Sequence, residues 1–298
     1  MVKTEFEVFL EKEIEKGKGV YFPATAGFLR RAFIKHLPCG ALHPNPQDEF
    51  CSPEIGPNYE IISRYEQDFR ILKDSQGYEY LKSAVCEPIE VERIHPDGYM
   101  ILNGHHRWAA ALRTGMKKLR VRIVDLTQEK DIRKMLSASR SDRRVTLDLD
   151  EVVFRPETDP FLEKPLRFPI RTIYKERLRR GIPGLFYLLN RLGYDIWVYT
   201  ANNLSLDYLR YYFKHYHTHV DGIITGAARK MEDGSRLQEE LSKAINAKYA
   251  VTVHVDNSTV VRTVRDRSTF DEFPLTDGGD GWVQEVVKVF EEMQKNEQ

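Results

Sequence analysis

The chain of 298 residues has few cysteines, no excess of either charge and no long apolar run. Its three cysteines, Cys39, Cys51 and Cys86, have no spacing typical of a metal or redox site, so we expect reduced thiols in a cytoplasmic protein. The first residues contain no apolar core of a signal peptide, and no run reaches the length of a membrane span. We therefore expect no contact with a membrane.

Charge is balanced, with 45 Lys and Arg against 45 Asp and Glu. A net charge of zero argues against a broad electrostatic grip on nucleic acid. A local basic group keeps nucleic acid open as the less favoured partner; it consists of Arg133, Lys134, Arg140, Arg143 and Arg144. A solvated surface is the simpler interpretation of that group.

The length fits two domains of ordinary size, and a hydrophobic content of 41% is sufficient for two cores. The run from Ser137 to Asp142 is small and polar, which is typical of a linker. We therefore predict an α/β chain in four segments: a helical extension at residues 1–40, a first domain at 41–136, a linker at 137–144 and a second domain at 145–298.

A β-rich run that begins at Val145 ends in two carboxylates, Asp148 and Asp150, which lie two positions apart. Past the end of a strand the alternation of side chains is lost, so the two acids can converge on one site. Carboxylate oxygens suit Mg²⁺, and a carboxylate can also attack phosphorus to form an aspartyl-phosphate. An acidic strand end or a helix N-cap is the alternative interpretation of the pair.

Three later strand ends carry groups of related chemistry. One predicted strand ends at Thr200, whose hydroxyl can bind a phosphate oxygen. A second is followed by Arg229 and Lys230, either of which can neutralise a phosphoryl group. A third is followed by Asp256, a further oxygen ligand for a metal.

This order of acid pair, hydroxyl, cation and acid resembles the layout of the haloacid dehalogenase (HAD) superfamily, over roughly residues 144–290. The resemblance implies a Rossmannoid three-layer α/β domain with a parallel sheet. It also implies that Asp148 is the nucleophile, Asp150 the general acid/base and Thr200 the phosphate-binding hydroxyl. Because few residues separate Asp148 from Thr200, we expect a phosphatase without a large cap domain.

The same resemblance implies that Mg²⁺ is held by the acid pair together with Asp256. It assigns the phosphate-binding cation to Lys230, with Arg229 and Lys243 as rivals. Val152 stands where many members have Thr, a departure that removes no catalytic group. Such a set suits phosphoryl transfer, which needs positioning and charge neutralisation above all.

An earlier segment has the pattern of an anion site. Two predicted strands form a hairpin over residues 89–102, and the sequence Asn103-Gly104-His105-His106-Arg107 then opens an Ala-rich helix. A turn that opens a helix presents backbone N–H groups to an anion, and Arg107 adds a planar charged fork. Capping and packing is the alternative role of the two His residues. A metal site is disfavoured, because adjacent His residues do not share a helix face.

The run from Leu102 to Leu112 resembles the phosphate-binding signature of the ParB/sulfiredoxin superfamily, over roughly residues 40–136. Two His before Arg resemble the free serine kinase branch more than the partition proteins. Sulfiredoxins have a catalytic Cys where this chain has His105, so sulfinic-acid reduction is not expected. The resemblance implies an α+β domain that binds ATP, ADP or another nucleotide, with kinase activity left open beside binding alone.

A kinase in this domain would need a base. The acidic turn at residues 47–50 precedes a predicted helix that begins at Tyr59. Glu49 in that turn is our candidate, and a solvated loop is the alternative interpretation.

Two classes of function follow. The first is a Mg²⁺-dependent phosphoryl-transfer enzyme, which combines a HAD-like phosphatase with a nucleotide-binding domain and acts on a phosphorylated small molecule or a nucleotide. The second is a nucleotide-sensing regulatory or DNA-associated binding protein whose HAD-like module is not catalytic.

Overall fold

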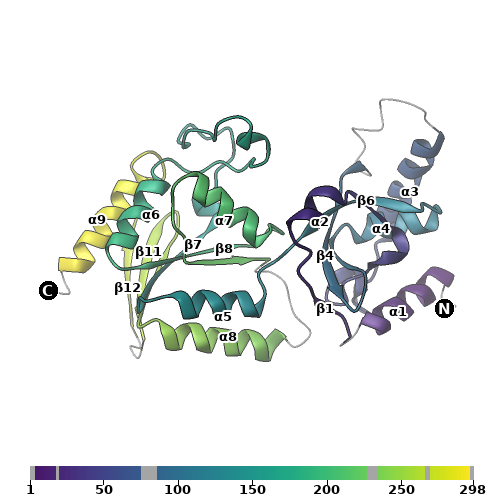
Figure 1. Ribbon diagram of the computed structural model, residues 1–298, viewed down its shortest axis with the longest axis horizontal. Helices are drawn as coiled ribbons and strands as arrows, with labels where there is room; N and C mark the ends of the chain where they lie inside the picture. The colour runs from purple at the N-terminus through teal and green to yellow at the C-terminus, as the bar shows by residue number, and fades with distance from the viewer. Residues whose placement is uncertain (1–3, 18–19, 75–85, 227–233, 266–268, 296–298) are drawn as a thin grey trace. The chain divides into compact units, whose positions relative to one another are not determined.

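The computed structural model describes the chain except residues 1–3, 18–19, 75–85, 227–233, 266–268 and 296–298. Two compact units divide it, the first comprising Met1–Asp125 and the second comprising Leu126–Arg229 with Gly234–Gln298. Each unit contains a six-stranded sheet with helices packed on it, so the predicted two-domain α/β fold class is confirmed (Figure 1). Within the described residues, no helix is both long and apolar enough to cross a membrane.

The sheet of the first unit has the order β2-β6-β4-β5-β3, and β1 also pairs with β4. Its strands are β1 (Phe22–Pro23), β2 (His36–Pro38), β3 (Leu42–His43), β4 (Ile89–His95), β5 (Tyr99–Asn103) and β6 (Lys118–Val124). Its helices are α1 (Glu5–Gly17), α2 (Phe28–Phe33), α3 (Tyr59–Asp74) and α4 (His105–Arg113), with short 3₁₀ helices at Cys39–Ala41 and Glu49–Cys51. The predicted hairpin is present as the antiparallel pair β4–β5.

The first forty residues are part of this unit. Strand β2 pairs with β6, and β1 pairs with β4, so both short strands complete the sheet. The buried carboxylate of Asp125 accepts hydrogen bonds from the backbone N–H of Ala26 (2.7 Å) and Gly27 (3.0 Å) and from Arg31 (2.7 Å). A charged acceptor with three donors fixes the entry to α2 against the end of β6.

The sheet of the second unit has the order β12-β11-β10-β7-β8-β9. Its strands are β7 (Arg143–Asp148), β8 (Asp195–Thr200), β9 (Gly222–Thr225), β10 (Val251–Val255), β11 (Thr259–Val264) and β12 (Phe270–Pro274). Its helices are α5 (Glu129–Ala138), α6 (Ile182–Arg191), α7 (Leu206–His215), α8 (Gly234–Lys248) and α9 (Trp282–Lys295), with a π-helical turn at Leu149–Val153 and a 3₁₀ helix at Ile170–Thr172. The strands β10, β7, β8 and β9 run parallel, and β11 and β12 add antiparallel pairs.

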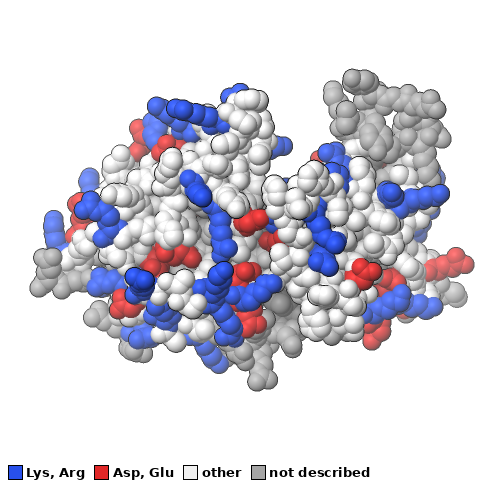
Figure 2. Space-filling view, viewed as in Figure 1, with Lys and Arg blue, Asp and Glu red and all other residues white. Residues whose placement is uncertain are grey.

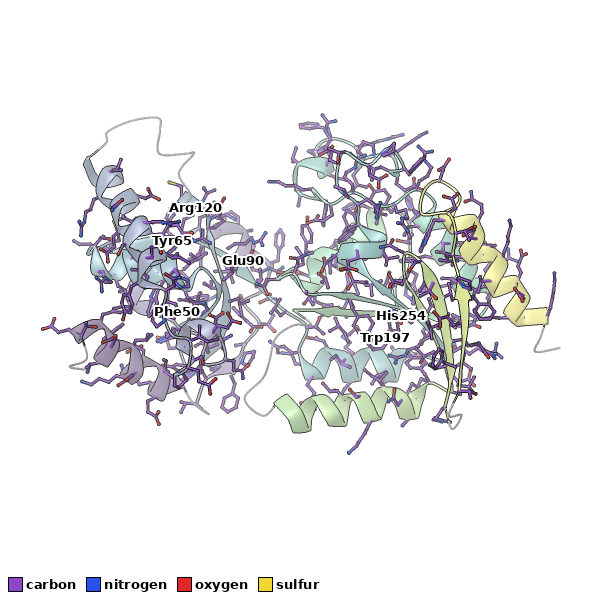
Figure 3. All side chains as sticks on the ribbon, turned by 180° about the vertical axis from the view of Figure 1, so that it is seen from behind. Phe50, Tyr65, Glu90, Arg120, Trp197 and His254 are labelled. Carbon is purple, nitrogen blue, oxygen red and sulfur yellow. The ribbon has the colours of Figure 1, made fainter. Side chains whose placement is uncertain are left out.

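Three layers result, with α5 and α8 on one face of the sheet and α6, α7 and α9 on the other (Figure 1). The alternation along β8 shows why, since Ile196 and Val198 belong to the core under α6, α7 and α9, whereas Trp197 packs with α5 and α8. Trp197, labelled in Figure 3, is fully buried. A Cβ at Gly222 would lie 2.0 Å from its ring, so only glycine fits on the neighbouring strand.

The division between the units falls earlier than the sequence suggested. Helix α5 belongs to the second unit, because its Ile132 and Met135 pack with Trp197 in one apolar cluster. The predicted linker therefore contains the end of α5 and the start of β7. Ser141 in this connection donates hydrogen bonds to the carbonyl oxygens of Arg143 and Gly193, which ties it to the second unit.

Candidate functional site

The carboxyl ends of the parallel strands meet at one edge of the second sheet. In the register of β7, Leu147 lies opposite Val255 of β10, and Asp148 lies opposite Tyr199 of β8. The residues that follow Val255 and Tyr199 are Asp256 and Thr200, so both come to the edge at which Asp148 lies. Such an edge is where ligands bind in open α/β sheets.

Asp148 starts the π-helical turn that follows β7. Its Oδ1 accepts hydrogen bonds from the backbone N–H of Asp150 (2.6 Å) and Glu151 (3.0 Å). The capping role considered for the acid pair is therefore present in the structure, and it fixes the orientation of the Asp148 carboxylate. One carboxylate oxygen, Oδ2, is not used by these two bonds.

The Asp150 carboxylate is held by the loop that follows β8. It accepts hydrogen bonds from the Thr200 hydroxyl (2.8 Å to each oxygen), from the backbone N–H of Ala201 (2.9 Å) and from Nδ2 of Asn202 (2.7 Å). Thr200 is fully buried, so its hydroxyl acts on Asp150 in this arrangement. The phosphate-binding role of Thr200 stays a prediction, and the contact from Asn202 is one that the sequence did not reveal.

Asn257 connects the end of β10 to the π-helical turn. Its Nδ2 donates to the carbonyl oxygen of Glu151 (3.1 Å), and its Oδ1 accepts from Arg179 (2.7 Å). The guanidinium of Arg179 lies over the Trp282 ring, 4.2 Å from its centroid. Burial lowers the pKa of Arg179 to about 10, so the group is still charged at neutral pH. Asp256 begins this connection, because its Oδ1 accepts from the Asn257 N–H (2.6 Å).

The predicted metal set is not assembled as a cluster. Among the residues that the structure describes, no group of three or more His, Cys, Asp and Glu is arranged to hold a metal ion. The hydrogen bonds explain this, since the Asp150 carboxylate is taken up by three donors and one oxygen of Asp148 is taken up by the π-helical turn. The oxygen donors of Asp148 and Asp256 still fit Mg²⁺ by type, and binding of the ion stays a prediction.

The choice among the three predicted cations stays a prediction. Lys230 and Arg229 lie outside the described residues. Lys243 is exposed on α8. On the visible face of the second unit, Lys and Arg are interspersed with Asp and Glu, as the zero net charge leads one to expect (Figure 2).

Other cations line a cavity that Asp150 also borders. A cavity of about 340 Å³ is lined by Asp150, Asn202, Arg155, Lys175 and Arg177, together with Phe154, Pro156, Glu157 and Glu176. The three cations come from the segment between β7 and α6, which is closed by isolated antiparallel bridges at Phe154–Leu178 and Leu162–Arg179. Arg155 pairs with Asp159 (2.7 Å), and Arg177 pairs with the exposed Glu157 (2.8 Å). Glu157 is exposed, so its pair with Arg177 is of the weak surface kind, and an incoming phosphate can compete for Arg177.

In the first unit, the predicted anion motif lines a cavity of about 300 Å³. All five motif residues border it, with Asp48, Ile61, Tyr65 and Leu102 completing the wall. Gly104 precedes α4 with φ of +104°, and a Cβ there would lie 2.5 Å from Cγ2 of Ile89. Only glycine therefore allows the chain to turn into the helix so that the residues of its first turn border the cavity.

The two His residues connect α4 to neighbouring loops through hydrogen bonds to their backbone N–H groups. His105 Nε2 accepts from the Asn45 N–H and His106 Nε2 from the Asn58 N–H, each at 3.1 Å. The Phe50 ring packs on both imidazoles, and Figure 3 labels Phe50 within this unit. Burial lowers the pKa of His105 to about 4, so it is neutral at pH 7 and adds no charge for an anion. Packing, the alternative considered for this pair, is thus part of its role.

Arg107 supplies the positive charge of the cavity. It is 8% exposed, and its NH1 donates to the carbonyl oxygen of Glu87 (2.9 Å). Glu49 is exposed and does not border the cavity, whereas its neighbour Asp48 does. Asp48 Oδ2 lies 3.5 Å from Nδ1 of His105. The structure therefore brings Asp48, rather than Glu49, to the motif.

Comparisons with known proteins match the region that contains the anion motif. The family model of the ParB N-terminal domain matches residues 75–140, a range that contains the motif at 103–107, so the ParB-like part of the expectation is confirmed. Among solved structures, the chain matches the crystal structure of the C-terminal domain of Coenzyme A biosynthesis bifunctional protein CoaBC at 19% identity and a TM-score of 0.18. That match covers 52% of this chain and 97% of the other, and its TM-score is too low to support an argument. No curated protein matches the chain.

Proposed function

We propose that the protein is a Mg²⁺-dependent phosphoryl-transfer enzyme, in which the second unit is a HAD-type phosphatase and the ParB-like unit binds a nucleotide or phosphate. One observation carries the proposal. The Asp150 carboxylate is fixed by three donors at the sheet edge that Asp148 shares, and it borders a cavity lined by Arg155, Lys175 and Arg177. Carboxylates for proton and phosphoryl transfer thus lie beside cations that suit a phosphate.

The proposed reaction has two steps. A carboxylate oxygen of Asp148 attacks phosphorus while the bond to the leaving oxygen breaks, and Asp150 gives that oxygen a proton. Asp150 then takes a proton from water as the water oxygen attacks the aspartyl-phosphate, which releases phosphate and restores Asp148. The three donors to Asp150 hold it in place for both proton transfers.

Asp148 and Asp256 are the residues that would hold the metal. Mg²⁺, when bound, supplies the positive charge that reduces repulsion between the attacking carboxylate and the phosphate oxygens. Asp150 is less suited as a ligand through its carboxylate, because three donors already contact its two oxygens. Its role in the proposal is therefore that of acid and base.

In the ParB-like unit, the cavity at the start of α4 is the proposed site for a nucleotide phosphate. Backbone N–H groups at a helix start and the buried Arg107 both favour an anion there. If this unit is also a kinase, Asp48 is the base that borders the cavity.

The test of the phosphatase is release of phosphate from an aryl phosphate with and without Mg²⁺. We expect wild type to be active, Asp148→Asn to lose activity, and chelation of the metal to abolish it. Glu151→Gln is the matched control, since Glu151 is exposed and contacts the site through its backbone. Equal rates for wild type and Asp148→Asn would refute the assignment of the nucleophile.

The regulatory alternative has one observation in its favour, the lack of an assembled carboxylate cluster in the described part of the chain. It predicts that wild type binds ATP or ADP but releases no phosphate with any divalent metal. Titration of ATP and ADP against wild type, Arg107→Ala and Arg107→Lys tests the binding that both functions require. Unchanged affinity in Arg107→Ala would place the nucleotide elsewhere.

A further inference from the structure

A second cavity, of about 410 Å³, lies within the second unit beside the one that Asp150 borders. Glu157, Lys175, Glu176 and Arg177 line both cavities, so the two are neighbours with a common wall. A ligand whose phosphate lies beside Asp150 therefore has room to extend across Lys175 and Arg177 into the larger cavity. The volume of this second cavity is in the range of small-molecule sites.

Two aromatic rings form part of its wall. Tyr174 and Tyr216 both line the cavity, and each packs against the buried ring of Tyr212, with centroids 5.6 Å and 5.2 Å apart. The Tyr216 hydroxyl donates to the carbonyl oxygen of Lys164 (3.2 Å). These contacts fix both rings before a ligand arrives, so little conformational entropy is lost on binding.

The charged groups of the wall match an anionic ligand. Arg171, Lys175 and Arg177 contribute the cations. The carboxylate of Glu176 accepts from the Tyr208 hydroxyl (2.5 Å), and Glu157 pairs with Arg177 (2.8 Å). Both carboxylates of the wall are thus engaged by protein groups, while Arg171 and Lys175 are exposed.

We propose that the substrate of this unit is a nucleoside monophosphate, with its phosphate beside Asp150 and its base against Tyr174 and Tyr216. The proposal rests on the proposed phosphatase function and names its substrate class. A nucleobase has a π-face that stacks on tyrosine, and such stacking contributes about 1–3 kcal/mol per base, whereas a sugar phosphate or an aliphatic phosphate has no such face. The cations between the cavities suit the phosphate and the ribose oxygens.

The experiment compares hydrolysis of adenosine 5′-monophosphate and glycerol phosphate, with the ratio of their kcat/KM values as the readout. We expect wild type to favour the nucleotide at least tenfold. Tyr216→Leu, which removes the ring, should lower that ratio by about tenfold or more, and Tyr216→Phe should keep it. Tyr211→Leu is the control on α7, the helix that Tyr216 follows, because Tyr211 is 55% exposed and does not line the cavity. A wild-type ratio near one, or an equal ratio in Tyr216→Leu, overturns the proposal.

A second measurement keeps the two proposals distinguishable. Hydrogen exchange with adenosine 5′-monophosphate present should protect peptides from residues 165–177 and 212–216, separately from any protection at residues 103–107 of the other unit. If no substrate is hydrolysed but these peptides are protected, the phosphatase fails and the nucleotide site stands. If glycerol phosphate is hydrolysed and these peptides are not protected, the nucleotide site fails and the phosphatase stands.

Discussion

Replacement of Gly104 by alanine tests how the ParB-like motif is built. Gly104 has φ of +104°, and a Cβ there would lie 2.5 Å and 2.9 Å from two carbons of Ile89, which is fully packed on β4. The left-handed backbone costs an alanine about 1–2 kcal/mol. Overpacking against Ile89 adds about 1–3 kcal/mol.

Gly115 provides the matched control. It has φ of +68°, and a Cβ there would meet no atom within 4 Å. Gly115→Ala therefore has the backbone cost without the clash, so Gly104→Ala should lower the free energy of unfolding by about 1–3 kcal/mol more.

Urea unfolding read by hydrogen-exchange mass spectrometry is the suitable assay, because it reports the two units separately. Gly104→Ala should also weaken nucleotide binding, since the first N–H groups of α4 would move, and Gly115→Ala should not. Equal destabilisation by the two variants would refute the steric explanation of the motif glycine.

Further predictions concern charged and polar groups of both units. Burial holds the pKa of His105 at about 4, below the ordinary value of about 6.5, so the stability it contributes is complete above pH 6.5 and is lost as the pH falls towards 4. The free energy of unfolding should therefore fall between pH 6.5 and pH 4, and His105→Gln should flatten this slope in urea titrations between pH 4 and 7. Thr200→Val removes one donor to Asp150 and should lower kcat about ten- to a hundredfold, whereas the kcat of Thr200→Ser should stay near that of wild type. A kcat of Thr200→Val equal to that of wild type would contradict the role of this hydrogen bond. Arg179→Met should keep the packing on Trp282 but release Asn257, so kcat should fall while the melting temperature changes little; a large loss of stability with unchanged kcat would show a purely structural arginine.

Much of the second unit was predictable because its strands are apolar runs that end in polar residues. Parallel strands place their carboxyl ends at one edge, so Asp148, Thr200 and Asp256 could be assigned to that edge from the sequence. The direction of each side chain could not, because it depends on the π-helical turn and on the donors of the loop after β8. The sequence therefore indicated a metal cluster where the structure shows a hydrogen-bonded carboxylate.

The cations of the site illustrate a different limit. Arg155, Lys175 and Arg177 lie in a segment with no strand or helix pattern in the sequence. Isolated bridges and backbone hydrogen bonds, one of them from the Arg155 N–H to the Arg177 carbonyl oxygen, bring them to the cavity that Asp150 borders. A lysine after a strand was the natural sequence choice, and it falls outside the described residues. Local spacing reveals which groups follow a strand, but it does not reveal how an irregular segment folds over them.

In the ParB-like unit, the motif was recognisable because glycine, arginine and the helix start are contiguous. The choice between Asp48 and Glu49 could not be predicted, since both are carboxylates and the sequence does not show which of the two faces the motif. Asp48 caps the 3₁₀ helix by accepting from the Phe50 N–H (2.9 Å), and this directs its carboxylate inward. Glu49, one residue later, is left facing solvent.

Strand β2 has a consequence for solubility. It occupies the outer side of β6, where Lys118, Leu119 and Arg120 would otherwise present unsatisfied N–H and C=O groups. An open edge of this kind recruits strands from other molecules. A shortened protein that starts after residue 40 would therefore expose the unpaired edge of β6. We expect it to self-associate before it loses the structure of the motif.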